Sequence, residues 1–235
     1  MRILILGATS TIARATAAKL AARGAELYLA GRDQAALERL ATDFHIRYNV
    51  SVAYGQFDIE DFGSHAGFWQ DVLTKMGSLD GVFFAIGCMG TDYQKIIAVN
   101  FTGAVSILNQ AADYFMVKKH GFIAAISSVA GDRGRQSNYL YGAAKAGLSV
   151  YLQGLRNKLF PYDVRVITIK PGLVDTAMIF GLPQMKYAAK PDRVARDIVR
   201  GINKRQDIIY TPWFWNYIMA IVKIIPERIF KRLNL

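Results

Sequence analysis

Residues 1–20 of the chain read MRILILGATSTIARATAAKL. The apolar run at 3–6 has the length of a buried strand, and the pattern at 12–23 is helical. Gly7 stands between the two, where glycine permits a tight turn, and the free N–H groups at the start of the helix face whatever lies above the strand. This stretch therefore predicts a strand, a turn and a helix N-terminus suited to the pyrophosphate of a dinucleotide, with a simple strand–helix turn as the alternative.

Short apolar runs alternate with helical patterns along the rest of the chain. The runs lie at 26–30, 50–54, 81–85, 122–127, 164–169 and 207–210, and the helical patterns at 33–44, 62–76, 94–118, 139–160 and 191–203. Because this alternation is typical of a sheet covered on both faces, we expect an α/β fold: a Rossmann-like, doubly wound, mostly parallel seven-stranded sheet. We expect one domain at 1–211, with a substrate loop near 173–190, and an amphipathic extension at 212–235. Ligands of such sheets bind beyond the carboxyl ends of the strands.

Composition narrows the class of protein. Hydrophobic residues make up 52% of the 235 and charged residues 20%, which is enough to fill a large core and argues against disorder. Cys88 is the single cysteine, so no internal disulfide forms; we expect a small packed residue in a reducing compartment. The opening apolar run is too short for a signal peptide, and no stretch of 18 apolar residues occurs, so a cytoplasmic protein is expected.

The charged and histidine residues indicate what the protein does not bind. The net charge is +11, but the 29 Lys and Arg are scattered and no nucleic-acid motif occurs, so nucleic acid is not an expected partner. His45, His65 and His120 have no spacing that suggests a metal site. We expect these histidines at the surface and no bound metal.

The second strand ends in AGRD, and its tip indicates which dinucleotide binds. An acidic side chain there accepts from a ribose 2′-hydroxyl and repels a 2′-phosphate, whereas Arg32 offers a forked cation to that phosphate. Asp33 is interpreted as the N-cap of the next helix. NADP(H) is therefore favoured over NAD(H). The turn at Gly7 departs from the three-glycine pattern, since Thr11 and Ala13 replace glycines.

Two further loops are candidates for cofactor contact. Asp58 follows the third strand, where it accepts from the adenine amino group or caps the following helix. Gly87, in FAIGCMG after the fourth strand, lets the backbone pass close to the cofactor ribose or is a plain turn glycine. The sequence leaves both pairs of alternatives open.

The stretch SNYLYGAAKAG at 137–147 carries the chemistry. Tyr141 and Lys145 are four residues apart and share one face of the predicted helix, whereas Tyr139 has Ala143 at that spacing. A nearby ammonium favours the phenolate, so Lys145 is expected to lower the pKa of Tyr141 and let it exchange protons near neutral pH.

Two polar residues complete this candidate centre. Ser128 lies thirteen residues before Tyr141, across the loop after the fifth strand, where its hydroxyl can hold a substrate oxygen. Asn100, in VNFTG, is placed in the middle of a predicted helix, where its side chain is unfavourable. A role in the site explains its position; the alternative is a helix that simply tolerates the residue.

These residues together resemble the short-chain dehydrogenase/reductase family of the classical type, over essentially the whole chain. The resemblance rests on Gly7, Asp58, AIG at 85–87, Asn100, Ser128, Tyr141, Lys145 and PGLVDT at 171–176. It implies hydride transfer between a nicotinamide and a carbonyl or alcohol carbon. It also implies a homo-oligomer.

The resemblance implies a role for each matching residue. Tyr141 is the proton donor in reduction, Lys145 also bonds the nicotinamide ribose, and Ser128 positions the carbonyl. Asn100 holds a water in a proton relay, and Thr176 lies near the carboxamide. The full predicted cofactor set is Gly7, Thr9, Ser10, Thr11, Ile12, Arg32, Asp58, Ala85, Gly87, Tyr141, Lys145, Pro171, Gly172, Val174 and Thr176.

Two stretches bear on the substrate. Arg133 and Arg135, in GDRGRQ, suit a phosphate or carboxylate beside the pocket, or else surface ion pairs. The ending TPWFWNYIMAIVKIIPERIFKRLNL combines aromatic and apolar residues with four cations and one glutamate. Such a segment suits a helix in the interface of an anionic bilayer, on the inner membrane face, or an element packed on the core or a dimer interface.

GDRGR and IPERIFKRL also resemble a narrower group, the reductases of decaprenylphosphoryl keto-sugars (2-keto-erythro-pentose). That likeness implies a lipid-linked, phosphate-bearing ketone as the substrate. We therefore expect an NADP(H)-dependent reductase of an apolar or lipid-linked ketone. The alternatives are a soluble carbonyl or 3-oxoacyl reductase, and an NADP-binding redox sensor without turnover.

Overall fold

The first strand and helix begin a sheet that grows outward on both sides of β1. The structure is a computed structural model that describes residues 1–179, 181 and 183–233. Its strands are β1 (Arg2–Leu6), β2 (Glu26–Gly31), β3 (Val52–Gln56), β4 (Gly81–Phe84), β5 (Gly121–Ile126), β6 (Val164–Pro171) and β7 (Ile208–Thr211). They form one sheet in the order β3-β2-β1-β4-β5-β6-β7, and every neighbouring pair is parallel. The predicted fold class is confirmed.

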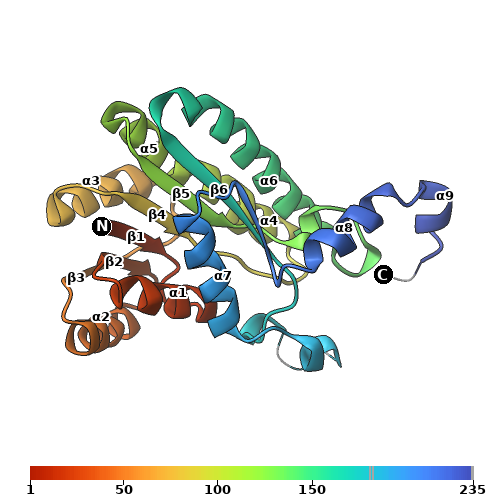
Figure 1. Ribbon diagram of the computed structural model, residues 1–235, viewed down its shortest axis with the longest axis horizontal. Helices are drawn as coiled ribbons and strands as arrows, with labels where there is room; N and C mark the ends of the chain where they lie inside the picture. The colour runs from red at the N-terminus through yellow and green to blue at the C-terminus, as the bar shows by residue number, and fades with distance from the viewer. Residues whose placement is uncertain (180, 182, 234–235) are drawn as a thin grey trace.

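Helices cover both faces of this sheet (Figure 1). The α-helices are α1 (Thr11–Ala21), α2 (Gln34–Tyr48), α3 (His65–Met76), α4 (Tyr93–Ile97), α5 (Gly103–Lys118), α6 (Tyr139–Leu159), α7 (Pro191–Asn203), α8 (Trp215–Ile224) and α9 (Glu227–Phe230). Helices α1, α2 and α7 lie on one face, and α3, α5 and α6 on the other, each over its own cluster of buried apolar side chains. The central strands β1, β2, β4, β5 and β6 are almost entirely buried, and their sequences are mostly apolar. The edge strands β3 and β7 are more exposed.

The predicted boundaries shift where a local cap decides them. Helix α2 runs four residues beyond the predicted end, because Asn49 adopts a left-handed conformation with φ 52° and donates its N–H to His45 O at 2.9 Å. Strand β3 consequently begins later than predicted. The helix predicted at 94–118 is interrupted by a π-helical turn at Ala98–Thr102, which contains Asn100.

One predicted surface residue is buried. His65, at the start of α3, is only 1% exposed, and its Nδ1 lies 2.8 Å from Ser106 Oγ. Burial lowers its pKa. The prediction was wrong because His65 faces α5, and the sequence does not show that α3 and α5 pack together. His45 and His120 are exposed, as expected.

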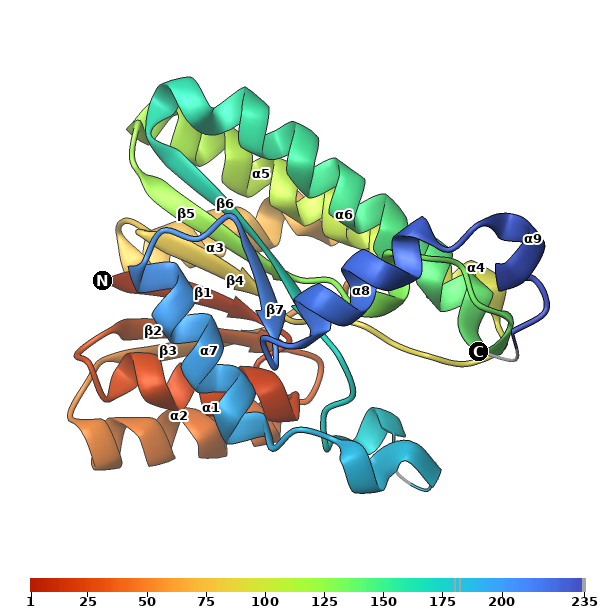
Figure 2. The same cartoon turned by 45° about the vertical axis from the view of Figure 1, so that its right-hand side comes forward.

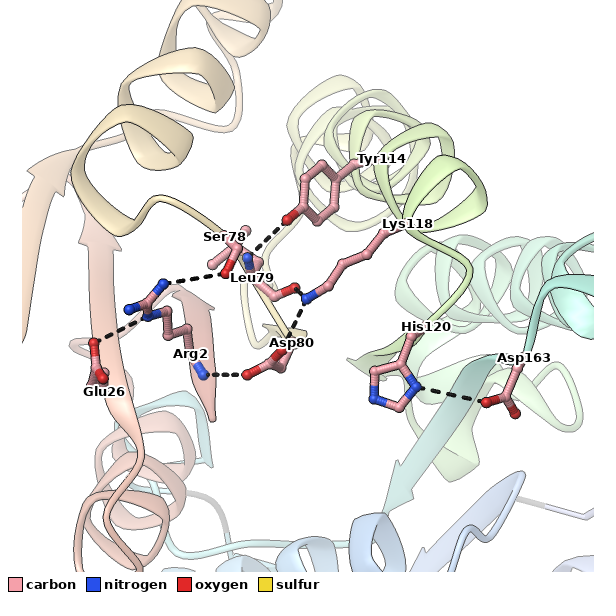
Figure 3. Close-up of polar contacts among 9 residues, drawn as sticks. All are labelled: Arg2, Glu26, Ser78, Leu79, Asp80, Tyr114, Lys118, His120 and Asp163. Carbon is pink, nitrogen blue, oxygen red and sulfur yellow. Dashed lines mark hydrogen bonds and ion pairs between the residues drawn. The ribbon is translucent and has the colours of Figure 1, made fainter.

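The edge of the sheet at the amino ends of the strands is held by polar contacts (Figure 3). Asp80 accepts the Arg2 backbone N–H at 2.9 Å and the Lys118 ammonium at 2.9 Å, which ties β1, β4 and the end of α5 together. Burial alone raises the pKa of Asp80, but these bonds more than offset it and the pKa is lowered. The candidate site described next lies at the other edge, beyond the carboxyl ends.

Candidate active site

A cleft opens where the chain direction across the sheet reverses, between the carboxyl ends of β1 and β4. It has a larger part of about 610 Å³ and a smaller part of about 260 Å³, which are continuous through the loops after β1 and β4. The larger part is lined by Thr9, Ser10, Thr11, Ile12, Ala85, Ile86, Gly87, Cys88, Met89, Ile126, Ser127, Ser128, Tyr141, Lys145, Pro171, Gly172, Val174, Thr176, Ala177 and Met178. Volumes of this order suit a bound small molecule.

The first turn has the form expected for a pyrophosphate site. Gly7 has φ +80°, and a Cβ there would lie 2.9 Å from Ile86 Cγ1 and 3.0 Å from the Ala85 backbone. Ser10 caps α1 by accepting the Ala13 N–H at 3.3 Å, so the helix N-terminus opens onto the cleft. Thr11 replaces a glycine of the usual pattern and remains exposed.

The tip of β2 places Arg32 at the smaller part of the cleft. Its side chain is exposed there beside Gly7 and Gly31. Asp33 turns to α2 instead, where its carboxylate accepts the Ala36 N–H at 2.9 Å. The N-cap predicted for Asp33 is confirmed, so this carboxylate is committed to the helix.

Asp58 is the one predicted cofactor residue that lines neither part of the cleft. Its carboxylate accepts the Glu60 N–H at 3.0 Å in a local turn, and its carbonyl oxygen lies 3.3 Å from His65 Nε2. The neighbours Phe57, Ile59 and Glu60 line the smaller part instead.

Ser128, Tyr141 and Lys145 come together at the larger part of the cleft. Ser128 follows β5, and Tyr141 and Lys145 face the cleft from the first turns of α6. Lys145 Nζ lies 5.7 Å from the centre of the Tyr141 ring and donates to Ile126 O at 3.1 Å. Lys145 is only 2% exposed. The shared face expected from the four-residue spacing is present.

Burial dominates the electrostatics of this pair. It raises the pKa of Tyr141 to about 12, while a hydrogen bond with Ser128 acts in the opposite direction. It lowers the pKa of Lys145 to about 8. The predicted lowering of the Tyr141 pKa was therefore wrong in direction for this structure, because desolvation of the phenol outweighs the other influences. At neutral pH the phenol keeps its proton and the lysine is mostly charged.

Asn100 lies directly behind the cleft and not on its wall. The residue is fully buried in the π-helical turn; its Nδ2 donates to Cys88 O and Ile96 O, both at 2.9 Å, and its Oδ1 accepts the Cys88 N–H at 3.2 Å. A Cβ on Gly87 would lie 2.9 Å from Asn100 Oδ1 and 3.3 Å from Lys145 Nζ. Glycine at 87 therefore allows the loop after β4, Asn100 and Lys145 to meet.

The loop between Ser128 and Tyr141 is anchored by a polar cluster that the sequence did not reveal. The nearly buried ion pair of Asp132 and Lys170 joins the loop to β6, and Tyr210 of β7 donates to Asp132 Oδ2 at 2.7 Å. Lys170 immediately precedes Pro171. The same cluster thus holds both the Ser128 loop and the loop after β6 that closes the cleft.

The two predicted substrate arginines do not line the cleft. Arg133 donates to Lys223 O at 3.0 Å and to Glu227 Oε2 at 2.8 Å, and its guanidinium lies 4.1 Å from the centre of the Phe230 ring. It therefore holds the C-terminal segment against the Ser128 loop. The buried Nε of Arg135 has no hydrogen-bond partner within the described residues.

Sequence reasoning missed several lining residues. Cys88, Met89, Ile126, Ala177 and Met178 all line the larger part of the cleft. Cys88 is half-buried there, so the expectation of a simply packed residue was incomplete. Cys88 directly follows the AIG stretch at 85–87, and this position in the sequence could have predicted that it lines the cleft. The predicted substrate loop near 173–190 includes residues 180 and 182, which lie outside the described residues.

The C-terminal extension packs partly on the rest of the molecule, which is one of the alternatives that the sequence left open. Met219 and Phe230 are buried, and the Trp215 indole lies against Gly172, where a Cβ would come within 1.9 Å of Trp215 Nε1. The other side of α8 is exposed and apolar.

In the described part of the chain, no helix has the length and hydropathy to cross a bilayer, and no group of three or more His, Cys, Asp or Glu residues is arranged for a metal ion.

Comparisons with known proteins agree with this geometry. The family model described as short chain dehydrogenase matches residues 1–186. An uncharacterized oxidoreductase of Streptomyces coelicolor is 32% identical over 243 residues, covering 98% of this chain and 95% of that protein. An uncharacterized oxidoreductase of Mycobacterium tuberculosis is 28% identical over 240 residues, covering 98% and 96%.

Solved structures show the same fold. A short-chain dehydrogenase from Sphingobium yanoikuyae in complex with NADPH superimposes with a TM-score of 0.82 at 22% identity and covers 96% of both chains. The bulky-bulky ketone specific alcohol dehydrogenase from Comamonas testosteroni gives 0.80 at 22% identity, covering 96% of this chain and 95% of that one.

The fold and the cleft define an oxidoreductase with a dinucleotide-type site at the switch point of its sheet. The chain belongs to the short-chain dehydrogenase/reductase family. The names of these relatives specify no lipid-linked substrate, so the likeness to reductases of decaprenylphosphoryl keto-sugars stays a prediction.

Proposed function

We propose that this enzyme uses NADP(H) to reduce a ketone to a secondary alcohol, and that the ketone is apolar or lipid-linked. The observation that carries the reaction is the meeting of Ser128, Tyr141 and Lys145 on one wall of the cleft. The name of the Sphingobium neighbour, solved with NADPH, supports the cofactor, and that of the Comamonas neighbour, which acts on bulky ketones, supports the substrate class.

The residues of the cleft fit a dinucleotide along its length. The turn at Gly7 and the N-terminus of α1 suit the pyrophosphate, Arg32 suits an adenosine 2′-phosphate, and the wall formed by Pro171, Gly172 and Thr176 suits the nicotinamide end. When bound, the cofactor supplies the hydride.

The chain's own residues supply the proton and the geometry. The Ser128 hydroxyl donates a hydrogen bond to the carbonyl oxygen of the substrate, and the Tyr141 hydroxyl transfers its proton to that oxygen as the carbonyl is reduced. The charged Lys145 then stabilises the phenolate that Tyr141 becomes, across the observed 5.7 Å to the ring centre. Asn100 fixes the loop after β4 around Lys145.

The preference for NADP(H) is tested at Arg32. Because a charge-assisted contact to a phosphate is worth about 1.5–3 kcal/mol, Arg32→Ala is expected to raise the Kd for NADPH by roughly tenfold to a hundredfold. The Kd for NADH is expected to stay nearly unchanged, since NADH lacks the 2′-phosphate. Nicotinamide fluorescence titration measures both constants. Arg39→Ala, which removes an exposed arginine on α2, is the matched control; equal losses for NADPH and NADH would remove the role of Arg32.

The lipid part of the proposal is supported by an exposed surface that we call the α8 apolar face. Its members are Trp213, Phe214, Tyr217, Ile218, Ile221 and Ile224. Contiguous exposed apolar residues of this kind mark interaction surfaces. Four cations adjoin the face, Lys223, Arg228, Lys231 and Arg232, against the single carboxylate of Glu227. This combination suits an anionic lipid surface.

An apolar-to-charged substitution tests this face. Ile221 is 63% exposed, so Ile221→Asp is not expected to disturb the core, whereas it removes about 1.5–3 kcal/mol of apolar burial in lipid. We expect roughly tenfold to a hundredfold weaker co-sedimentation with vesicles of phosphatidylcholine and phosphatidylglycerol. Val117→Asp, at an 82% exposed position on α5, is the control and is expected to bind as wild type does. An equal effect of both variants, or none of either, would favour a soluble carbonyl or 3-oxoacyl reductase.

The reaction itself is tested by NADPH oxidation over a panel of ketones and lipid extracts, with the Tyr141 variant argued in the Discussion as the comparison. Turnover that depends on Tyr141 excludes the alternative of a redox sensor without turnover. A homo-oligomer, which the family leads us to expect, is part of the proposal and is checked by light scattering.

A further inference from the structure

A second pocket lies between the loop after Ser128 and the C-terminal helix α9. Figure 2 shows this loop beside α8 and α9 at one end of the molecule. It measures about 360 Å³ and shares no lining residue with the dinucleotide cleft. Its lining residues are Arg133, Gly134, Arg135, Gln136, Glu227, Phe230, Lys231 and Leu233. The pocket is therefore separate from the cleft.

The charges around this pocket are unbalanced. Three cations line it, Arg133, Arg135 and Lys231, against the single carboxylate of Glu227. Glu227 pairs with Arg133 at 2.8 Å, and Arg133 also lies over the Phe230 ring. The charge of Arg133 is therefore already neutralised by a neighbour. Within 1–179, 181 and 183–233, neither Arg135 nor Lys231 forms an ion pair. Two positive charges thus remain for a ligand.

Arg135 is the more informative of the two. Its Nε is buried and has no hydrogen-bond partner among the described residues. Burial lowers the pKa of its guanidinium, and the charge of Asp132 only partly opposes this effect. A buried donor without a partner costs about 1–3 kcal/mol, and more when it is charged. An oxyanion that accepts from this guanidinium removes that cost.

The surroundings favour a phosphoryl group over other oxyanions. A guanidinium binds phosphate through two parallel bonds, and Lys231, which also lines the pocket, adds a second cation. The pocket adjoins the α8 apolar face, since only Ile225 and Pro226 separate α8 from α9. A phosphate ester attached to a lipid can therefore place its phosphoryl group in the pocket and its chain along that face.

We propose that Arg135 and Lys231 form a binding subsite for the phosphoryl group of a lipid phosphate ester, apart from the dinucleotide cleft. Taking this ester to be the lipid-linked ketone rests on the proposed function. The affinity for phosphoryl groups rests only on the pocket. A membrane phospholipid headgroup and free phosphate present the same chemistry, and the experiment separates these sources.

The test is isothermal titration calorimetry of the full chain with three probes. They are dihexanoyl phosphatidylglycerol, dihexanoyl glycerol, which lacks the phosphate, and inorganic phosphate. We expect the phosphatidylglycerol to bind more tightly than the dihexanoyl glycerol, and inorganic phosphate to compete with it. Arg135→Gln is expected to weaken phosphatidylglycerol binding by roughly tenfold or more, which corresponds to the loss of one charge-assisted contact. Lys231→Gln is expected to weaken it less.

Arg39→Gln removes an equal charge from an exposed position on α2 and is expected to bind as wild type does. An equal loss of phosphatidylglycerol affinity in Arg39→Gln and Arg135→Gln would show that only the net charge of the protein matters, and would overturn the proposal. Equal affinity of the wild type for phosphatidylglycerol and for dihexanoyl glycerol would also overturn it. If Arg135→Gln does not fold, Lys231→Gln carries the test, because Lys231 is exposed. The calorimetry needs neither NADPH nor turnover, so its failure is distinguishable from failure of the reductase activity.

Discussion

Tyr141→Phe is expected to lower the kcat of ketone reduction by roughly a thousandfold while leaving the Kd for NADPH within about twofold of the wild-type value. The phenylalanine keeps the ring that packs in the cleft and removes only the hydroxyl that donates the proton. Because the phenol has a pKa raised to about 12 by burial, it holds that proton throughout the neutral range in the free enzyme. The Ser128 hydroxyl is a poor substitute, since it is placed to bind the substrate oxygen and is a weaker acid than a phenol.

The matched control for this variant is Tyr139→Phe on the same helix. Tyr139 is 64% exposed and does not line the cleft, so its hydroxyl has no part in the reaction. We expect this control to keep wild-type kcat and KM. Steady-state NADPH oxidation over a panel of ketones measures both variants. Wild-type turnover by Tyr141→Phe would end the assignment of Tyr141 as the proton donor.

Lys145→Met is expected to lower kcat by roughly a hundredfold to a thousandfold and to change its dependence on pH. Lys145 has a pKa lowered to about 8 by burial, so its charge is present below pH 8 and is lost as the pH rises through that value. The charged form stabilises the developing Tyr141 phenolate. Wild-type reduction is therefore expected to be flat in the neutral range and to fall above about pH 8.

The variant has no such titration, so the fall above pH 8 should be absent from its weak residual activity. The groups that bear on Lys145 are Tyr141 and Cys88, and the thiol of Cys88 has a pKa raised by burial. Cys88→Ala is therefore included and is expected to retain the alkaline fall. The result that contradicts this account is an alkaline fall that persists in Lys145→Met and disappears in Cys88→Ala.

The sheet was predictable because its strands carry their own signal. The central strands, which are buried on both faces, are mostly apolar, and the turn at Gly7 marks the first carboxyl end, so strand number, order of elements and position of the cleft follow from local patterns. The spacing of Tyr141 and Lys145 on one helix face was predictable for the same reason.

Contacts between distant segments were not predictable from local patterns. Asp132 meets Lys170 and Tyr210, which are 38 and 78 residues away, and Arg133 meets Glu227 at a separation of 94. The charge pattern of the loop left open a phosphate or carboxylate ligand and surface ion pairs, and the fold pairs Arg133 with Glu227 of the C-terminal segment. The π-helical turn at Asn100 likewise depends on hydrogen bonds to Cys88 in the loop after β4. The apolar periodicity of the helix does not predict these bonds.

The direction of the Tyr141 pKa shift was not predicted because the four-residue spacing shows that Lys145 is a neighbour but does not show how deeply the phenol is buried. An ammonium one turn away lowers a phenol pKa, but the depth of the cleft determines how much desolvation opposes it. Here desolvation is the larger effect. The consequence is a phenol that suits proton donation, with Lys145 acting on the phenolate as it forms.

The central claim is that the carbonyl carbon receives hydride from the nicotinamide while Tyr141 protonates the oxygen. The most direct measurement uses NADPH deuterated at the transferable position and mass spectrometry of the alcohol formed from the best ketone of the panel. We expect wild type to place one deuterium on the carbinol carbon, and Tyr141→Phe to bind the same cofactor yet form almost no labelled alcohol. Labelled alcohol at equal rates from both proteins, or alcohol without deuterium from wild type, would contradict the account.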